Sequence, residues 1–217
     1  MAGLKAVLFD NDGTLVDSHD LILESFHHAG PAVLGRQLSD EEYMQKTGQP
    51  LSVQVKDFTD DPVLQQRFCD VYRAHNKTVH DAMIKAFPGT GHALAQLTHA
   101  GLAVGVVTSK RHETAVRGLE ITGLWDFCDC LVGWDDIERP KPDPQPVEVG
   151  CKMLHVAPEE CIYVGDAPFD LQAGSAAGCA TAAVTWGMFD EARLAAEAPT
   201  LIARSWDDLV REILTLR

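Results

Sequence analysis

The sequence predicts an α/β protein in which helices cover both faces of a mainly parallel sheet. Short apolar runs recur along the chain, and stretches of helical length and period separate them. About ninety residues lie between the first two apolar runs, whereas a parallel crossover needs only about a dozen. A helical insertion is therefore expected after the first strand.

The predicted strands and helices alternate along the rest of the chain. The strands are AVLF at 6–9, LAVGVVT at 102–108, CDCLVG at 128–133, CIYVG at 161–165 and ATAAVTW at 180–186. The helices between them cover 91–100, 112–122, 144–154 and 171–177. This order favours a parallel sheet, because parallel neighbours need a crossover that a helix supplies.

The insertion itself has helical character. Apolar side chains recur at helical spacing from Leu64 to Val79, and a second such pattern begins at Leu21. The turn-forming segment FPGTG at 87–91 ends the insertion. We therefore predict a helical unit over 18–86 and a core made of 1–17 and 87–217.

Composition limits the partners. The chain has 18 basic and 32 acidic residues, and its net charge of -14 argues against nucleic acid or an anionic membrane. No apolar run is long enough to cross a bilayer and no signal-peptide pattern begins the chain, so a cytoplasmic location is expected. The six cysteines lack the spacing of a zinc or redox motif and are interpreted as reduced packing residues.

Polar residues follow the predicted strands. They are Asp10 and Asp12 after the first strand, Thr108, Ser109 and Lys110 after the second, and Asp166 and Asp170 after CIYVG. The carboxyl ends of parallel strands meet at one edge of a sheet, so these side chains should converge. Carboxylates gathered in this way suit Mg²⁺, which also accepts phosphate oxygens as ligands.

Four segments give the chain a specific resemblance: DNDGTLVDS, VVTSK, KPDP and VGDAPFD, in that order. The sequence resembles the haloacid dehalogenase superfamily, and most of all its phosphoglycolate phosphatase branch. The likeness covers nearly the whole core, while the insertion matches only in position and helical character. The resemblance implies a three-layer Rossmann-like core with a helical cap at 18–86.

The resemblance also implies roles for the first two motifs. Asp10 would be the nucleophile that forms an aspartyl-phosphate. Asp12 would protonate the leaving group and then activate water, while its backbone carbonyl helps to hold Mg²⁺. Thr108 would donate its hydroxyl to a phosphate oxygen, beside the backbone of Ser109.

The later motifs supply charge and metal ligands in the same comparison. Lys141 of KPDP would balance the charge between Asp10 and the transferring phosphoryl group. Asp10 and Asp166 would bind the metal together with the Asp12 carbonyl, and Asp170 would support the metal site from behind. Lys110 follows the second strand and is a further phosphate-binding candidate.

The substrate must be inferred from the insertion, where the pattern is weakest. The segment QKTGQPLS at 45–52 has loop composition, and its Lys46 and Gln49 are candidates to contact the substrate beyond its phosphate. The resemblance implies a Mg²⁺-dependent phosphatase that acts on a small phosphorylated metabolite, such as a phosphoglycolate-like monoester. A monomer or a homodimer would fit.

Other functions remain open at this point. A hexose-phosphate mutase of the same superfamily would use the same two aspartates, and a pyrophosphatase of that superfamily is also an alternative. A signalling domain switched by a phosphorylated aspartate is the alternative of another class, although its phosphorylated residue does not follow the first strand.

Overall fold

The computed structural model describes residues 3–217, so residues 1–2 of the predicted core lie outside the described part. Six parallel strands form the main sheet in the order β5-β4-β1-β6-β7-β8. The strands are β1 (Ala6–Phe9), β4 (Ala103–Val107), β5 (Cys130–Val132), β6 (Cys161–Gly165), β7 (Ala180–Val184) and β8 (Leu201–Ala203). The first strand thus lies inside the sheet, between β4 and β6.

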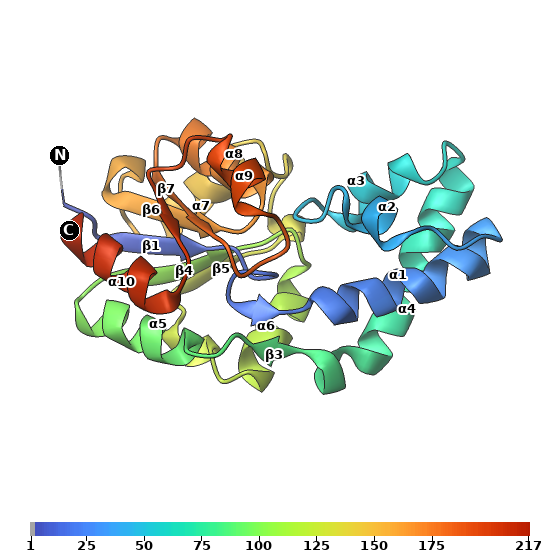
Figure 1. Cartoon of the computed structure of the whole chain (residues 1–217), viewed down its shortest axis with the longest axis horizontal. Helices are drawn as coiled ribbons and strands as arrows, with labels where there is room; N and C mark the ends of the chain where they lie inside the picture. Colours follow the sequence, from blue (N-terminus) through green and yellow to red (C-terminus); the bar gives the residue numbers. More distant parts are fainter. Residues whose placement is uncertain (1–2) are drawn as a thin grey trace.

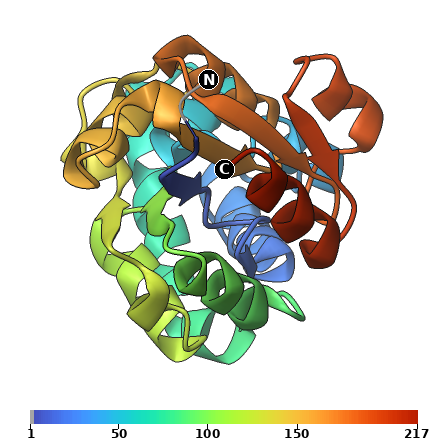
Figure 2. The same ribbon diagram turned by 90° about the vertical axis from the view of Figure 1, so that its left-hand side faces the viewer.

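Helices cover both faces of this sheet (Figure 2). The helices outside the insertion are α5 (Thr90–His99), α6 (His112–Ile121), α7 (Gln145–Met153), α8 (Pro168–Ala177), α9 (Glu191–Ala195) and α10 (Trp206–Thr215). Short 3-10 turns occupy Trp125–Phe127, Trp134–Asp136 and Pro158–Glu160.

Alternation along β1 explains the two apolar layers. Val7 and Phe9 pack in the layer that contains the buried side chains of α5, α6 and α10. Ala6 and Leu8 pack in the opposite layer, with α7 and α8. Successive strand residues point to opposite faces, so a strand covered on both sides must be apolar throughout, as AVLF is.

The insertion after β1 is a separate helical group, seen beside the sheet in Figure 1. It contains α1 (His19–Leu34), α2 (Asp40–Met44), α3 (Leu51–Gln54), a 3-10 turn at Val55–Asp57 and α4 (Pro62–Met83). Helices α1 and α4 pack along each other around a cluster of stacked and tilted aromatic rings centred on Phe26. We call this group the cap.

Two short strands connect the cap to the core. Strand β2 (Val16–Asp17) pairs antiparallel with β3 (Lys85–Ala86), so the chain leaves and re-enters the core side by side. The predicted division at 18 and 86 falls at this pair and stays a prediction, whereas the helical insertion after β1 is confirmed.

The structure confirms the predicted α/β class and its parallel sheet, and it adds elements after residue 186. Strand β8 has three residues, too few for a periodic pattern, so the sequence did not predict it. Helix α8 begins at Pro168, three residues before the predicted 171, because a proline is well tolerated in the first turn. Within residues 3–217, no helix has the length and apolar character needed to span a membrane.

The two-layer packing predicts unequal effects of two leucine substitutions. Leu97 of α5 is fully buried, so Leu97→Ala should lower the free energy of unfolding by about 2–5 kcal/mol. Leu214 of α10 is 38% exposed, and Leu214→Ala should change it by no more than about 0.5 kcal/mol. Urea unfolding measures both, and equal losses would contradict the assigned packing.

Candidate active site

A tight turn after β1 carries the first two carboxylates. The Asp10 N–H donates to the Val164 carbonyl, which extends the pairing with β6 by one residue. The Asn11 carbonyl then accepts the N–H groups of Leu15 and Val16, which folds the chain back on itself. Gly13 has φ +81° inside this turn, a conformation that glycine adopts without strain.

A buried ammonium joins two carboxylates below this turn. Lys141, only 2% exposed, donates from Nζ to Asp10 Oδ1 at 2.9 Å and to Asp170 Oδ1 at 2.5 Å. Its third hydrogen bond goes to the Tyr163 hydroxyl at 3.2 Å, and that hydroxyl donates to the Val107 carbonyl. Burial favours the neutral amine, yet the two carboxylates outweigh it and raise the pKa of Lys141 well above its usual value.

Asp166 completes a buried group of three carboxylates. Oxygens of Asp10, Asp166 and Asp170 lie within 4.8 Å of one another. Asp166 also accepts hydrogen bonds from the Thr14 hydroxyl at 3.0 Å and the Met188 N–H at 2.8 Å. Burial, and then repulsion by Asp170, raises the pKa of Asp166 to about 7. Burial also raises the pKa of Asp10 well above its usual value.

Asp12 lies outside this carboxylate group and has its own cation. Lys110 donates to Asp12 Oδ1 at 2.5 Å, and the Ser18 hydroxyl donates to the same oxygen at 2.6 Å. Burial alone would raise the pKa of Asp12, but the Lys110 ammonium and these hydrogen bonds hold it below its usual value. The metal role predicted for Asp12 uses only its backbone carbonyl and stays a prediction.

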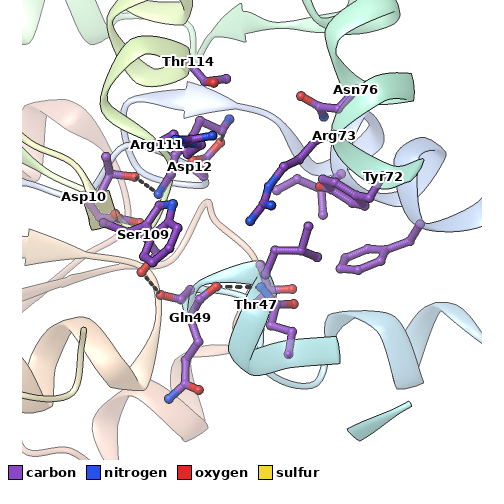
Figure 3. A pocket seen from close by; sticks show the side chains of 18 residues that line it. Asp10, Asp12, Thr47, Gln49, Tyr72, Arg73, Asn76, Ser109, Arg111 and Thr114 are labelled. Carbon is purple, nitrogen blue, oxygen red and sulfur yellow. Dashed lines mark hydrogen bonds and ion pairs between the residues drawn. The ribbon is translucent and has the colours of Figure 1, made fainter. Parts of the chain in front are cut away.

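Core and cap residues share a cavity of about 130 Å³ around Asp10 and Asp12. Figure 3 shows Thr47 and Gln49 on one side of this cavity and Tyr72, Arg73 and Asn76 on another. The Ser109 hydroxyl donates to the Gly48 carbonyl at 2.6 Å, so the core and the cap touch at the edge of the cavity. Residues of the core and of the cap therefore form this edge of the cavity together.

Thr108, a predicted phosphate donor, lies at the wall of the cavity. It follows β4, lines the cavity and is 4% exposed. Its hydroxyl oxygen accepts the Lys110 N–H at 3.1 Å, which leaves the hydroxyl proton available to a ligand.

Two of the residues expected to contact the substrate differ in position. Gln49 lines the cavity, whereas the side chain of Lys46 pairs with Asp57 at 2.7 Å and is not part of the lining. The Lys46 ammonium has a suitable charge for a phosphorylated substrate, but it already forms an ion pair with a carboxylate of the cap.

The sequence pattern missed Arg73 and Tyr163. Arg73 lines the cavity from α4, and in Figure 3 its side chain extends from the helix into the cavity. The helical period of the insertion shows only its apolar side, so it gave no signal for Arg73. Tyr163 is a polar group in the middle of the buried strand CIYVG, which signals that a buried partner must exist.

Comparison with known proteins identifies the family. The model of the haloacid dehalogenase-like hydrolase family matches residues 7–184. The chain belongs to this family. Two curated relatives carry the name pyrophosphatase PpaX: that of Anoxybacillus flavithermus is 34% identical over 207 residues, and that of Bacillus velezensis is 35% identical over 211 residues. Each alignment covers 95% of this chain and 95% of the relative.

Solved structures support the fold. A predicted phosphoglycolate phosphatase from Haemophilus somnus superimposes with a TM-score of 0.89 at 23% identity, covering 98% of this chain and 99% of the other. The α/β core with a helical cap after the first strand is therefore that of a haloacid dehalogenase-like hydrolase. Family membership shows that the chain is a hydrolase. At 23% identity, the solved structure supports only the fold.

The turn that carries Asp12 contains Gly13, and we expect a substitution of this glycine to lower activity. A Cβ at Gly13 would lie 2.2 Å from Asp166 Oδ2, so Gly13→Ala must displace that carboxylate. We expect Gly13→Ala to lower phosphate release from an activated phosphate ester at least tenfold, which corresponds to about 1.4 kcal/mol of transition-state stabilisation.

Gly35 supplies the matched control. It has φ +69° and a Cβ there would meet nothing within 4 Å, so Gly35→Ala carries the same kind of backbone strain without the clash. Gly35→Ala should lose about 1 kcal/mol of stability from the backbone strain alone, Gly13→Ala should lose more because of its clash, and only Gly13→Ala should lose activity. Equal activities in the two variants would show that the position of Asp166 does not matter for turnover.

Proposed function

We propose that the chain is a Mg²⁺-dependent phosphohydrolase that cleaves inorganic pyrophosphate. The observation that carries this proposal is Arg73, which lines the cavity of Asp10 and has no ion-pair partner among residues 3–217. A substrate with a second phosphate brings a second set of anionic oxygens, and a guanidinium binds such oxygens well. The relatives named pyrophosphatase PpaX support the same choice.

The core residues would carry out the transfer. An Asp10 oxygen attacks the phosphorus, a new oxygen–phosphorus bond forms, and the bond to the bridging oxygen breaks, which releases phosphate. Asp12 would take up a proton when the anionic substrate binds beside it. It then gives that proton to the leaving oxygen and later takes one from the water that hydrolyses the aspartyl-phosphate. The Thr108 hydroxyl and the Ser109 N–H would hold the non-bridging oxygens, and Lys110 stands beside Asp12.

The Lys141 ammonium would neutralise part of the charge on the transferring group. It also holds Asp10 in place, because its remaining contacts to Asp170 and Tyr163 are buried. A nucleophile fixed in this way needs little reorganisation before attack.

The carboxylate group fits Mg²⁺. When Asp10, Asp166 and Asp170 are all ionised, they carry three negative charges against one positive charge on Lys141, which leaves a net charge of -2 in a buried place. A divalent cation offsets that charge, and carboxylate oxygens are the ligands it prefers. Asp10, Asp166 and the Asp12 carbonyl would hold the ion while Asp170 supports them, and the ion would supply charge for the phosphoryl oxygens.

A phosphoglycolate-like monoester is the second candidate substrate. Its carboxylate offers Arg73 a second anionic group as well. The cavity lining also includes apolar side chains that suit an organic group better than a second phosphate, those of Ile22, Leu51, Tyr72 and Trp134. A phosphohexose mutase would transfer the phosphoryl group to a sugar and not to water, so release of inorganic phosphate separates it from both candidates. The cytoplasmic location and the oligomeric state stay predictions.

The test of the proposed function compares two substrates under identical conditions. With Mg²⁺ present, kcat/KM for pyrophosphate should exceed that for phosphoglycolate at least tenfold, and a chelator should stop both reactions. The measurement is phosphate release over a range of substrate concentrations. A preference for phosphoglycolate of the same size would make the monoester the substrate, and turnover without Mg²⁺ would refute the metal assignment.

Arg73 allows a sharper test of the second phosphate site. Arg73→Met removes the charge and keeps much of the length, so the loss of a charge-assisted contact should raise KM for pyrophosphate about ten- to hundredfold. An activated aryl phosphate has no second phosphate, and its KM should change less than threefold.

Arg67→Met is the control on the same helix. Arg67 is outside the cavity lining, and its guanidinium reaches only the Ala32 carbonyl at 3.5 Å. The control should leave both KM values unchanged. If Arg73→Met raised KM equally for pyrophosphate and for the aryl phosphate, Arg73 would support the structure of the cap and would not bind a second phosphate.

A further inference from the structure

Three cysteines that lie far apart in the sequence meet at the edge of the sheet opposite the active site. Cys151 is in the last turn of α7, Cys161 is the first residue of β6, and Cys179 lies between α8 and β7. Their sulfur atoms all lie within 4.8 Å of one another, and the Cys151 and Cys179 sulfurs are 3.8 Å apart. Strand β6 runs from this cluster to the active-site edge, a distance of roughly 13 Å.

We propose that Cys151, Cys161 and Cys179 form a binding site for one zinc-type cation, Zn²⁺ or Cd²⁺. The distances carry the proposal. A Zn–S bond is about 2.3 Å, so two thiolates at a tetrahedral zinc ion are about 3.8 Å apart. The Cys151 and Cys179 sulfurs already have this separation, so the ion would need little movement of either side chain.

A disulfide fits the same atoms less well. Its sulfurs must be about 2.05 Å apart, so Cys151 and Cys179 would have to approach by more than 1 Å and Cys161 would have no role. Thiolates are preferred ligands of soft and borderline cations. A disulfide would use only two of the three cysteines, whereas a metal ion can bind all three.

Charge and burial favour a divalent ion over a monovalent one. The exposed fractions of Cys151, Cys161 and Cys179 are 1%, 0% and 8%, and the surrounding side chains are mostly apolar. Three thiolates leave a net charge of -1 with a divalent ion and -2 with a monovalent ion, and buried charge is costly. Within residues 3–217 the cluster supplies three ligand side chains, whereas zinc has four ligands. A water molecule on the side of Cys179 would be the fourth ligand of the ion.

Binding would release protons and transfer no electrons. Hydrogen bonds with Cys151 and Cys179, together with burial, raise the pKa of the Cys161 thiol. The Cys161 thiol therefore gives its proton to solvent as its metal–sulfur bond forms. The ion would tie α7 and β6 to the end of α8, elements that follow Lys141, precede Asp166 and contain Asp170.

The experiment is a Zn²⁺ titration of the reduced protein against a competing chromophoric chelator. A thiol-free reductant and excess Mg²⁺ keep the cysteines reduced and the carboxylate site filled. We expect the wild type to bind one equivalent of Zn²⁺. Cys151→Ser, Cys161→Ser and Cys179→Ser should each bind it at least tenfold more weakly.

Two other cysteines are controls. Cys130 is buried in the same apolar layer but is not part of the cluster, and Cys69 is buried in the cap. Cys130→Ser and Cys69→Ser should keep the wild-type affinity. Equal Zn²⁺ affinity in the wild type and the three cluster variants would overturn the proposal.

A second measurement needs no variant. Cd²⁺ added to the wild type should give the ultraviolet charge-transfer absorption of cadmium–thiolate bonds, saturating at one equivalent, and should raise the unfolding temperature. Absence of that absorption, or a protein mass lower by two hydrogens after air oxidation with no Cd²⁺ binding in the reduced form, would refute the site.

Discussion

The buried ion pair of Lys141 with Asp10 and Asp170 is the constraint on which the active site depends. An ammonium in this position must have all of its protons bonded, and it finds two carboxylates and the Tyr163 hydroxyl. These partners come from the end of β1, from β6 and from α8, so one side chain connects three elements of the core. Removing the Lys141 ammonium would leave both carboxylates buried without their cation.

The rest of the site is arranged around this constraint. Asp166 comes one residue after β6, and its oxygens are held by Thr14 and Met188, which leaves three carboxylates around a single lysine. Asp12 has a separate partner in Lys110, so its proton chemistry is kept apart from that group. The proposed Mg²⁺ would complete the charge balance, and the cap would add Arg73 for the second phosphate.

The sequence predicted the core of the site because position along a strand determines position in the sheet. Asp10, Thr108 and Asp166 each follow an apolar strand, and parallel strands bring their carboxyl ends to one edge. The cap was harder, because helical spacing shows which side is apolar and not which polar side chain reaches another domain. The charge of Lys46 suggests a substrate contact, yet Lys46 pairs with Asp57, while Arg73 lines the cavity. Local spacing could not predict the cysteine cluster either, because its members come from different elements.

The central claim is that Lys141 holds the buried carboxylates together, and a double-mutant cycle with Asp170 tests it most directly. With Mg²⁺ chelated, Lys141→Met should lower the free energy of unfolding by about 3–5 kcal/mol, because it leaves carboxylates buried without their cation. Adding Asp170→Asn to that variant should restore part of the loss, since one of those carboxylates is then neutral. Two results would contradict the account. One is a Lys141→Met protein as stable as the wild type, and the other is a double variant that loses more stability than the two single variants lose together.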